Sequence, residues 1–150
     1  MTKTMKKPRK KKCKSMARLV DDLAVALQKH VRIKAADSSG YVSCVTCEAQ
    51  GKRTVKHWKE MQGGHFIERG KAHKTLEENI HPQCPYCNQY GMKKASVVLA
   101  YRRYMVGCYG EKFVKSLEAT ANDVVKRCRA DVEVEIKDIN RRNRELEARL

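Results

Sequence analysis

Two Cys-x-x-Cys pairs constrain this chain more than any other feature of its sequence. Cys44 and Cys47 form the first pair, and Cys84 and Cys87 form the second. Four thiols in two such pairs are typical of a structural zinc site, which is closed and leaves no position for a water molecule. We therefore expect Zn²⁺ to stabilise the fold, and any catalysis must come from other residues.

The chain has 150 residues and a formal net charge of +16, and the N-terminus is its most basic part. Residues 1–15 are too charged to fold alone, so we expect a disordered arm that contacts phosphates; a solubilising tail or targeting signal is the alternative. No lipid-facing apolar stripe accompanies the charge, which favours nucleic acid over a membrane as partner. The basic residues at the centre of the arm are Lys6, Lys7, Arg9, Lys10, Lys11 and Lys12.

Cysteine usage indicates the cellular compartment. Seven cysteines are an odd number, and Cys13, Cys108 and Cys128 have no partners at matching spacing. A disulfide framework is therefore a poor interpretation, and a reducing cytoplasm fits better. The sequence contains no apolar run long enough to span a membrane and no signal peptide at its N-terminus, so we expect a soluble protein.

The first half of the chain predicts one helix and three strands. Apolar residues recur at helical spacing over residues 15–36, and His30 has a lone position there that suggests a surface or boundary residue. Residues 41–43 and 54–61 have strand character. Gly63 and Gly64 are expected to end the second strand, and residues 65–67 to pair with it in a hairpin that presents His65.

The second half is mainly helical. Residues 69–78 form a polar loop, and Pro85 suits the first turn of a helix that carries Asn88. Further helices are predicted over residues 95–106, 111–117 and 122–150. The last has a narrow apolar stripe between many charges, so we expect a long, solvated and lightly packed helix that could also form a dimer seam.

These elements predict an α+β fold in three parts. They are a disordered basic arm (1–15), a zinc-stapled domain with flanking helices (16–120) and a charged C-terminal helix (121–150). In the middle part His65 is the candidate general base, since an unshifted histidine pKa suits proton abstraction near pH 7. Asn88 follows the last zinc thiol directly and could bind Mg²⁺ or Mn²⁺. Asn79 is expected to bond backbone groups near His65 and orient it.

The sequence resembles a known group in these same segments. Gly64-His65-Phe66, Asn79 to Cys84, and Cys87-Asn88 resemble an HNH nuclease of the ββα-metal type. The wider string from Trp58 to Gly70, with residues 101–104 and 109–110, is similar to the NinG (Rap) family of phage recombination proteins. The similarity spans about residues 41–118, and the basic arm and the C-terminal helix lie outside it.

The resemblance implies a structure-specific endonuclease that cuts branched recombination intermediates such as Holliday junctions or D-loops, in the host cytoplasm if a phage encodes it. It places the general base on His65 and the catalytic-metal ligand on Asn88. The residue before the base is often a metal-binding Asp in such enzymes, but it is Gly64 here. His81 is our first substitute for that ligand, and Glu60 or Gln62 the second.

We expect metal-assisted phosphodiester hydrolysis at this site. Arg69 is predicted to brace the scissile phosphate, and Lys71 in the same loop to contact DNA. A symmetric junction has two scissile phosphates, so a homodimer is possible. The alternatives are a nicking HNH enzyme without branch preference and a zinc-ribbon module that binds DNA without cutting it.

Overall fold

The computed structural model describes residues 13–150. Within them the chain has the expected mixed α+β character, mostly helical with two small sheets. The basic residues predicted to contact DNA, Lys6 to Lys12, lie outside the described residues. In chain order the elements are α1 (Met16–Ala35), β1 (Tyr41–Ser43), α2 (Val45–Glu48), β2 (Val55–His57), β3 (Gln62–His65), η1 (Glu77–Asn79), β4 (Ile80–Gln83), α3 (Pro85–Gln89), η2 (Gly91–Lys93), α4 (Ala95–Tyr109), α5 (Glu111–Ala119) and α6 (Arg129–Glu147).

The strand pairing differs from the expected hairpin. β1 pairs antiparallel with β2, and β3 pairs antiparallel with β4, so the strand that ends in His65 has its partner in residues 80–83. The predicted pairing of residues 54–61 with 65–67 is therefore wrong. β2 is also shorter than expected, because a turn at Trp58 to Met61 separates it from β3.

Gly63 lies inside β3 and does not end a strand as predicted. A Cβ atom at Gly63 would stand 2.7 Å from the Cα of Gln28 in α1. The glycine therefore permits close approach between the strand and the helix backbone, which is a common reason for glycine within a strand. This contact sets the position of β3 against α1.

Helix α1 begins where the sequence predicts. The Ser15 side chain accepts a hydrogen bond from the Arg18 backbone N–H at 3.2 Å, which satisfies a free donor of the first turn. The buried face of α1 packs against β3, β4 and α6. Its largest buried residues include Leu19, Leu23, Leu27 and Val31.

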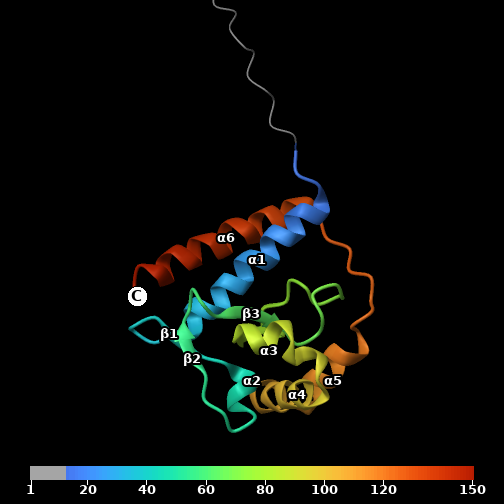
Figure 1. Cartoon of the computed structure of the whole chain (residues 1–150). Helices are drawn as coiled ribbons and strands as arrows, with labels where there is room; N and C mark the ends of the chain where they lie inside the picture. Colours follow the sequence, from blue (N-terminus) through green and yellow to red (C-terminus); the bar gives the residue numbers. More distant parts are fainter. Residues whose placement is uncertain (1–12) are drawn as a thin grey trace, which may run out of the picture.

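Helix α6 begins at Arg129, later than the predicted start at residue 122, and it is well packed on one side. Figure 1 shows α6 running along α1 at one end of the molecule. Val132 and Ile139 are buried in the same apolar cluster as α1 and Ile80 of β4. The expectation of a lightly packed helix is therefore wrong, and this part of its stripe is not free to form a dimer seam.

A buried polar contact joins the same two helices. His30 is 1% exposed, so the prediction of a surface or boundary residue is wrong. Its Nδ1 lies 2.9 Å from Oδ1 of Asn143, and Asn143 Nδ2 donates to the carbonyl of Ala26 at 3.0 Å. Arg142 Nη2 lies 3.0 Å from His30 Nε2. Because guanidinium can only donate, His30 is neutral with its proton on Nδ1.

The helices α4 and α5 cover the other end of the molecule (Figure 1). Their predicted positions at residues 95–106 and 111–117 are confirmed, with α4 extending three residues further to Tyr109. Tyr101, Met105 and Val114 form their buried core with Phe66, which follows β3. No helix within residues 13–150 is both long and apolar enough to cross a lipid bilayer.

Candidate functional site

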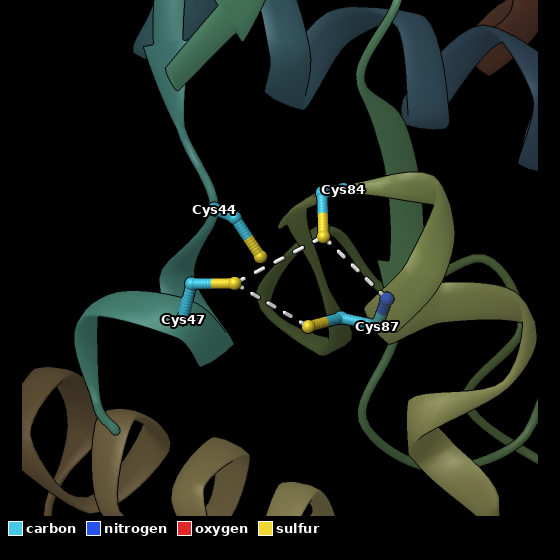
Figure 2. A group of neighbouring side chains, drawn as sticks. All are labelled: Cys44, Cys47, Cys84 and Cys87. Atoms are coloured by element: carbon cyan, nitrogen blue, oxygen red, sulfur yellow. Dashed lines mark hydrogen bonds between the residues drawn. The ribbon is translucent and has the colours of Figure 1, made fainter. Parts of the chain in front are cut away.

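The four cysteines of the two pairs meet in one buried cluster. Cys44 and Cys84 occupy the N-cap positions of α2 and α3, and Cys47 and Cys87 follow within the first turns. All four sulfur atoms lie within 4.8 Å of one another. In Figure 2 the two helix starts face each other and the four sulfurs point into the space between them. The cluster can hold a metal ion, as the sequence spacing predicts, and its ligand set suits zinc.

Burial shapes the chemistry of this cluster. It raises the pKa of the thiols of Cys47 and Cys87, because a thiolate is poorly solvated there. A bound cation would offset that cost and hold the sulfurs as thiolates. The arrangement therefore favours a metal-stabilised fold and supplies no open ligand position for catalysis.

A surface pocket of about 670 Å³ opens between α1, β3 and α3. His65 and Asn88 both line it, as do Arg69 and Lys93. The structure thus brings the predicted general base, the predicted metal-binding amide and the predicted phosphate-binding arginine to one concave surface. Its basic side chains suit an anionic ligand.

His65 is held by the loop that follows it. Its Nε2 lies 2.9 Å from the backbone carbonyl of Lys74. A carbonyl can only accept, so Nε2 carries a proton and Nδ1 holds the lone pair when the ring is neutral. Burial lowers the pKa of His65, contrary to the unshifted value expected, and this keeps the ring neutral at pH 7.

Asn88 is oriented by a neighbouring amide. Its Nδ2 donates to Oε1 of Gln62 at 2.8 Å. This contact engages the nitrogen side of the amide and leaves Oδ1 as the atom available to a cation. Gln62 was a candidate for the second metal ligand, and in the structure it positions Asn88 through this hydrogen bond.

Asn79 is fully buried and bonded to the backbone of the 67–73 loop. Its Oδ1 accepts from the N–H of Ile67 at 2.7 Å, and its Nδ2 donates to the carbonyls of Ile67 and His73 at 2.9 and 3.1 Å. These bonds join the segment after His65 to β4. They are of the kind expected for a residue that orients His65, and a contribution of Asn79 to catalysis stays a prediction.

Comparison with known families shows which family the chain is related to. The family model described as Bacteriophage Lambda NinG protein matches residues 1–148. The chain belongs to the NinG family. No curated protein and no solved structure matches it. The NinG match includes the basic arm and α6, which the resemblance over residues 41–118 had left outside.

The structure does not support His81, the first choice for a second metal ligand in this NinG-family chain. Its Nδ1 lies 3.1 Å from the hydroxyl of Tyr101, and its Nε2 lies 3.0 Å from the hydroxyl of Tyr109. Both ring nitrogens are therefore engaged by tyrosines, and His81 does not line the pocket that contains Asn88. The alternative Glu60 is exposed in the turn before β3.

The predicted DNA contacts lie in the loop after β3. Arg69 is exposed and reaches Asp21 of α1 at 3.7 Å, so it remains accessible to a phosphate. Lys71 is exposed and donates to Oδ1 of Asn122 at 2.8 Å, outside the pocket of His65. Contact of either residue with DNA stays a prediction.

Two residues that sequence reasoning passed over lie beside the cysteine cluster of this NinG-family chain. Thr46 Oγ1 lies 3.2 Å from Sγ of Cys44, and Gln83 Nε2 donates to the same Oγ1 at 3.3 Å. Both side chains are fully buried. Their adjacency to zinc-site cysteines was the available signal, but spacing alone does not reveal which way a polar side chain points.

Proposed function

We propose that this protein is a metal-dependent endonuclease that cuts branched DNA intermediates of phage recombination, such as Holliday junctions or D-loops. The observation that carries the proposal is the meeting of His65 and Asn88 in one basic pocket between α1, β3 and α3. Membership of the NinG family supports the link to recombination. The antiparallel strand pair followed at once by α3 is also the arrangement that an HNH nuclease would need.

His65 is the general base in this proposal. The Lys74 carbonyl holds its Nε2 proton, so Nδ1 can take a proton from the attacking water. The lowered pKa keeps this nitrogen unprotonated at neutral pH. The base is therefore ready without a conformational change of the ring.

The other pocket residues bind and orient the phosphate. Asn88 would hold Mg²⁺ or Mn²⁺, which when bound stabilises negative charge on the phosphate and on the departing 3′ oxygen. Arg69 and Lys93 line the same pocket and would draw in the DNA backbone. Cleavage would leave 5′-phosphate and 3′-hydroxyl ends.

The basic arm, the place of action and the preference for branched DNA complete the proposed function. The basic arm would add phosphate contacts that do not depend on sequence, and the cytoplasm of an infected host would be the place of action. Preference for branches over plain duplex is supported by family membership alone, because nothing in the pocket distinguishes the two.

The proposal is tested by incubating linear, nicked and four-way DNA with the protein in Mg²⁺ or Mn²⁺. We expect wild type to cut the four-way DNA preferentially. Replacing His65 by alanine should slow cleavage about 10²–10⁴-fold, because a general base typically contributes that much. The rates are measured by gel electrophoresis of end-labelled strands.

The matched control is His57→Ala, which removes a histidine that does not line the pocket. This variant should keep nearly the full rate. Cleavage by His65→Ala at the wild-type rate would overturn the assignment of the base. Equal cutting of all three DNAs would indicate a nicking enzyme without branch preference, and binding without cutting would indicate a non-catalytic module.

A further inference from the structure

Gln83 at the end of β4 carries a buried oxygen without a partner. The residue is 0% exposed, and its Oε1 is the single buried side-chain nitrogen or oxygen within residues 13–150 that makes no hydrogen bond. A buried oxygen without a hydrogen bond destabilises the folded state, because it has lost its bonds to water. Such an atom in a native fold calls for an explanation, and coordination of a cation would supply one.

The place of this oxygen is defined by Gly64. A Cβ atom at Gly64 would stand 1.7 Å from Gln83 Oε1 and 3.0 Å from Asn88 Oδ1. The two amide oxygens therefore converge on the space that a side chain at position 64 would fill. That position directly precedes His65, so the oxygens meet beside the proposed base.

Hydrogen bonds fix which atom of each amide faces this space. In an occupied metal site Cys44 is a thiolate and can only accept, so the Thr46 hydroxyl donates to it. Thr46 Oγ1 must then accept from Gln83 Nε2, which turns Oε1 toward Gly64. The bond from Asn88 Nδ2 to Gln62 turns Asn88 Oδ1 in the same way.

We propose that Gln83 Oε1 is the second protein ligand of the catalytic divalent cation, paired with Asn88 Oδ1 in the space beside Gly64. It takes the place of the carboxylate that Gly64 cannot provide. The ion would be Mg²⁺ or Mn²⁺, because both bind amide oxygens and keep several waters. This inference rests on the proposed function for the ion's role, but ion binding can be measured without any cleavage.

Two neutral amides as ligands determine how tightly the site would bind a cation. They add no negative charge, so the protein alone should bind the cation weakly, and DNA phosphates would complete its shell. Gln83 is fully buried and does not line the pocket itself, whereas Asn88 does. The cation would therefore lie between the two amides, and Thr46 would connect its position to the cysteine cluster.

The test measures Mn²⁺ affinity of the full-length, zinc-loaded protein by the electron paramagnetic resonance signal of free Mn²⁺. Gln83→Met keeps the side-chain length but removes the oxygen, and we expect affinity to fall at least about 10-fold. Gln83→Glu keeps an oxygen and adds charge, and we expect affinity to rise about 10-fold. Asn88→Leu gives the background from Mn²⁺ bound elsewhere.

This pair of variants separates a ligand from a structural residue. Both lose the N–H that bonds Thr46, so a purely structural Gln83 would give the same change in both. A third variant combines Gly64→Asp with Gln83→Ala, which clears the space above position 64 and returns a carboxylate to it. We expect this double variant to bind Mn²⁺ at least as tightly as wild type. Zinc content and melting temperature are followed in parallel.

Equal Mn²⁺ affinity of wild type, Gln83→Met and Gln83→Glu would overturn the inference, as would wild type that binds no more Mn²⁺ than Asn88→Leu. If Gln83→Met does not fold, the Glu and double variants decide. The failure of the two proposals can be distinguished. The predicted order of affinities without DNA cleavage would reject the nuclease and keep the ion site, whereas cleavage that needs His65 with unchanged affinities would reject Gln83 alone.

Discussion

At the scale of single residues, His81 shows how burial and hydrogen bonding fix a protonation state. The Tyr101 hydroxyl donates to the carbonyl of Gly64 at 2.8 Å, so its oxygen must accept from His81 Nδ1. His81 Nε2 then accepts from the hydroxyl of Tyr109. This series of hydrogen bonds is therefore complete when the His81 ring is neutral, with its proton on Nδ1. Burial lowers the pKa of His81 to about 4.

His81 should make the fold sensitive to acid. Its pKa is about 4 when folded and about 6.5 when unfolded, so the unfolded chain binds the proton more readily and stability falls as pH drops below 6.5. Between pH 7 and pH 5 the loss from this residue should be about 2 kcal/mol. His81→Gln, which cannot be protonated, should lose that much less, as measured by urea unfolding at both pH values.

Comparing the pH-dependent loss between wild type and variant cancels acid effects on other groups, such as His30, His65 and the cysteines. A variant that loses as much stability as wild type between pH 7 and pH 5 would show that His81 is not the titrating group. Because tyrosine hydroxyls engage both of its ring nitrogens, His81 is better explained as a structural residue than as a metal ligand.

At the scale of elements, α1 packs along α6, so the first and last helices of residues 13–150 lie side by side. Val132 and Ile139 are 0% and 3% exposed against α1, whereas Val134 on the same helix is 64% exposed. The apolar stripe of α6 is narrow because it contacts a single helix. Its charged residues face solvent and form surface ion pairs such as Arg141 with Asp138 and Glu145.

Truncating the buried stripe should therefore destabilise the protein. Ile139→Ala removes a buried side chain and should lower the free energy of unfolding by about 2–4 kcal/mol. Val134→Ala, the matched control on the exposed face, should change it by no more than about 0.5 kcal/mol. Chemical denaturation followed by circular dichroism gives both values, and equal effects would restore the solvated helix that the sequence suggested.

At the scale of the whole molecule, the cysteine cluster connects segments that are far apart in the chain. It joins α2, which follows β1, to α3, which follows β4, and its apolar cluster includes Ile33 of α1 and Val97 of α4. The His65 pocket lies on strand β3 and helix α3 of the same frame. Loss of the cluster should therefore disturb both the fold and the candidate site.

Removing the metal should unfold much of the protein. We propose zinc as the ion, and structural zinc contributes about 10–16 kcal/mol in small domains, as much as the whole stability of a typical protein. A chelator strong enough to remove zinc, or Cys84→Ser, should cause loss of helical circular dichroism and of DNA cleavage together. Cys108→Ser is the control, because Cys108 is exposed and outside the cluster. A chelated protein that keeps its spectrum would contradict a structural role.

The formation of a homodimer stays a proposal. Symmetric cutting of a four-way junction needs two sites, which favours a dimer. The buried part of the α6 stripe packs on α1 of its own chain, so it does not supply the contact.

The sequence by itself determined the features that depend on residue type and short spacing. Two Cys-x-x-Cys pairs predicted the cluster, because few other arrangements use four thiols so spaced. Helical periodicity predicted α1, and Pro85 predicted the start of α3 with Asn88 on it. His65, Asn79 and Asn88 were chosen by the same local reasoning.

Tertiary structure alone decided which segments meet. From the sequence, strand β3 could pair with residues before it or after it. The structure shows that its partner is β4, and that Gly63 lets β3 approach Gln28 of α1. His30, His81 and Gln83 are polar residues whose burial depends on segments distant in sequence, so no local pattern could predict it. The clearest example is the Gln83 oxygen beside Gly64. Its position next to Asn88 depends on how β3, β4 and α3 pack together, which the local sequence does not reveal.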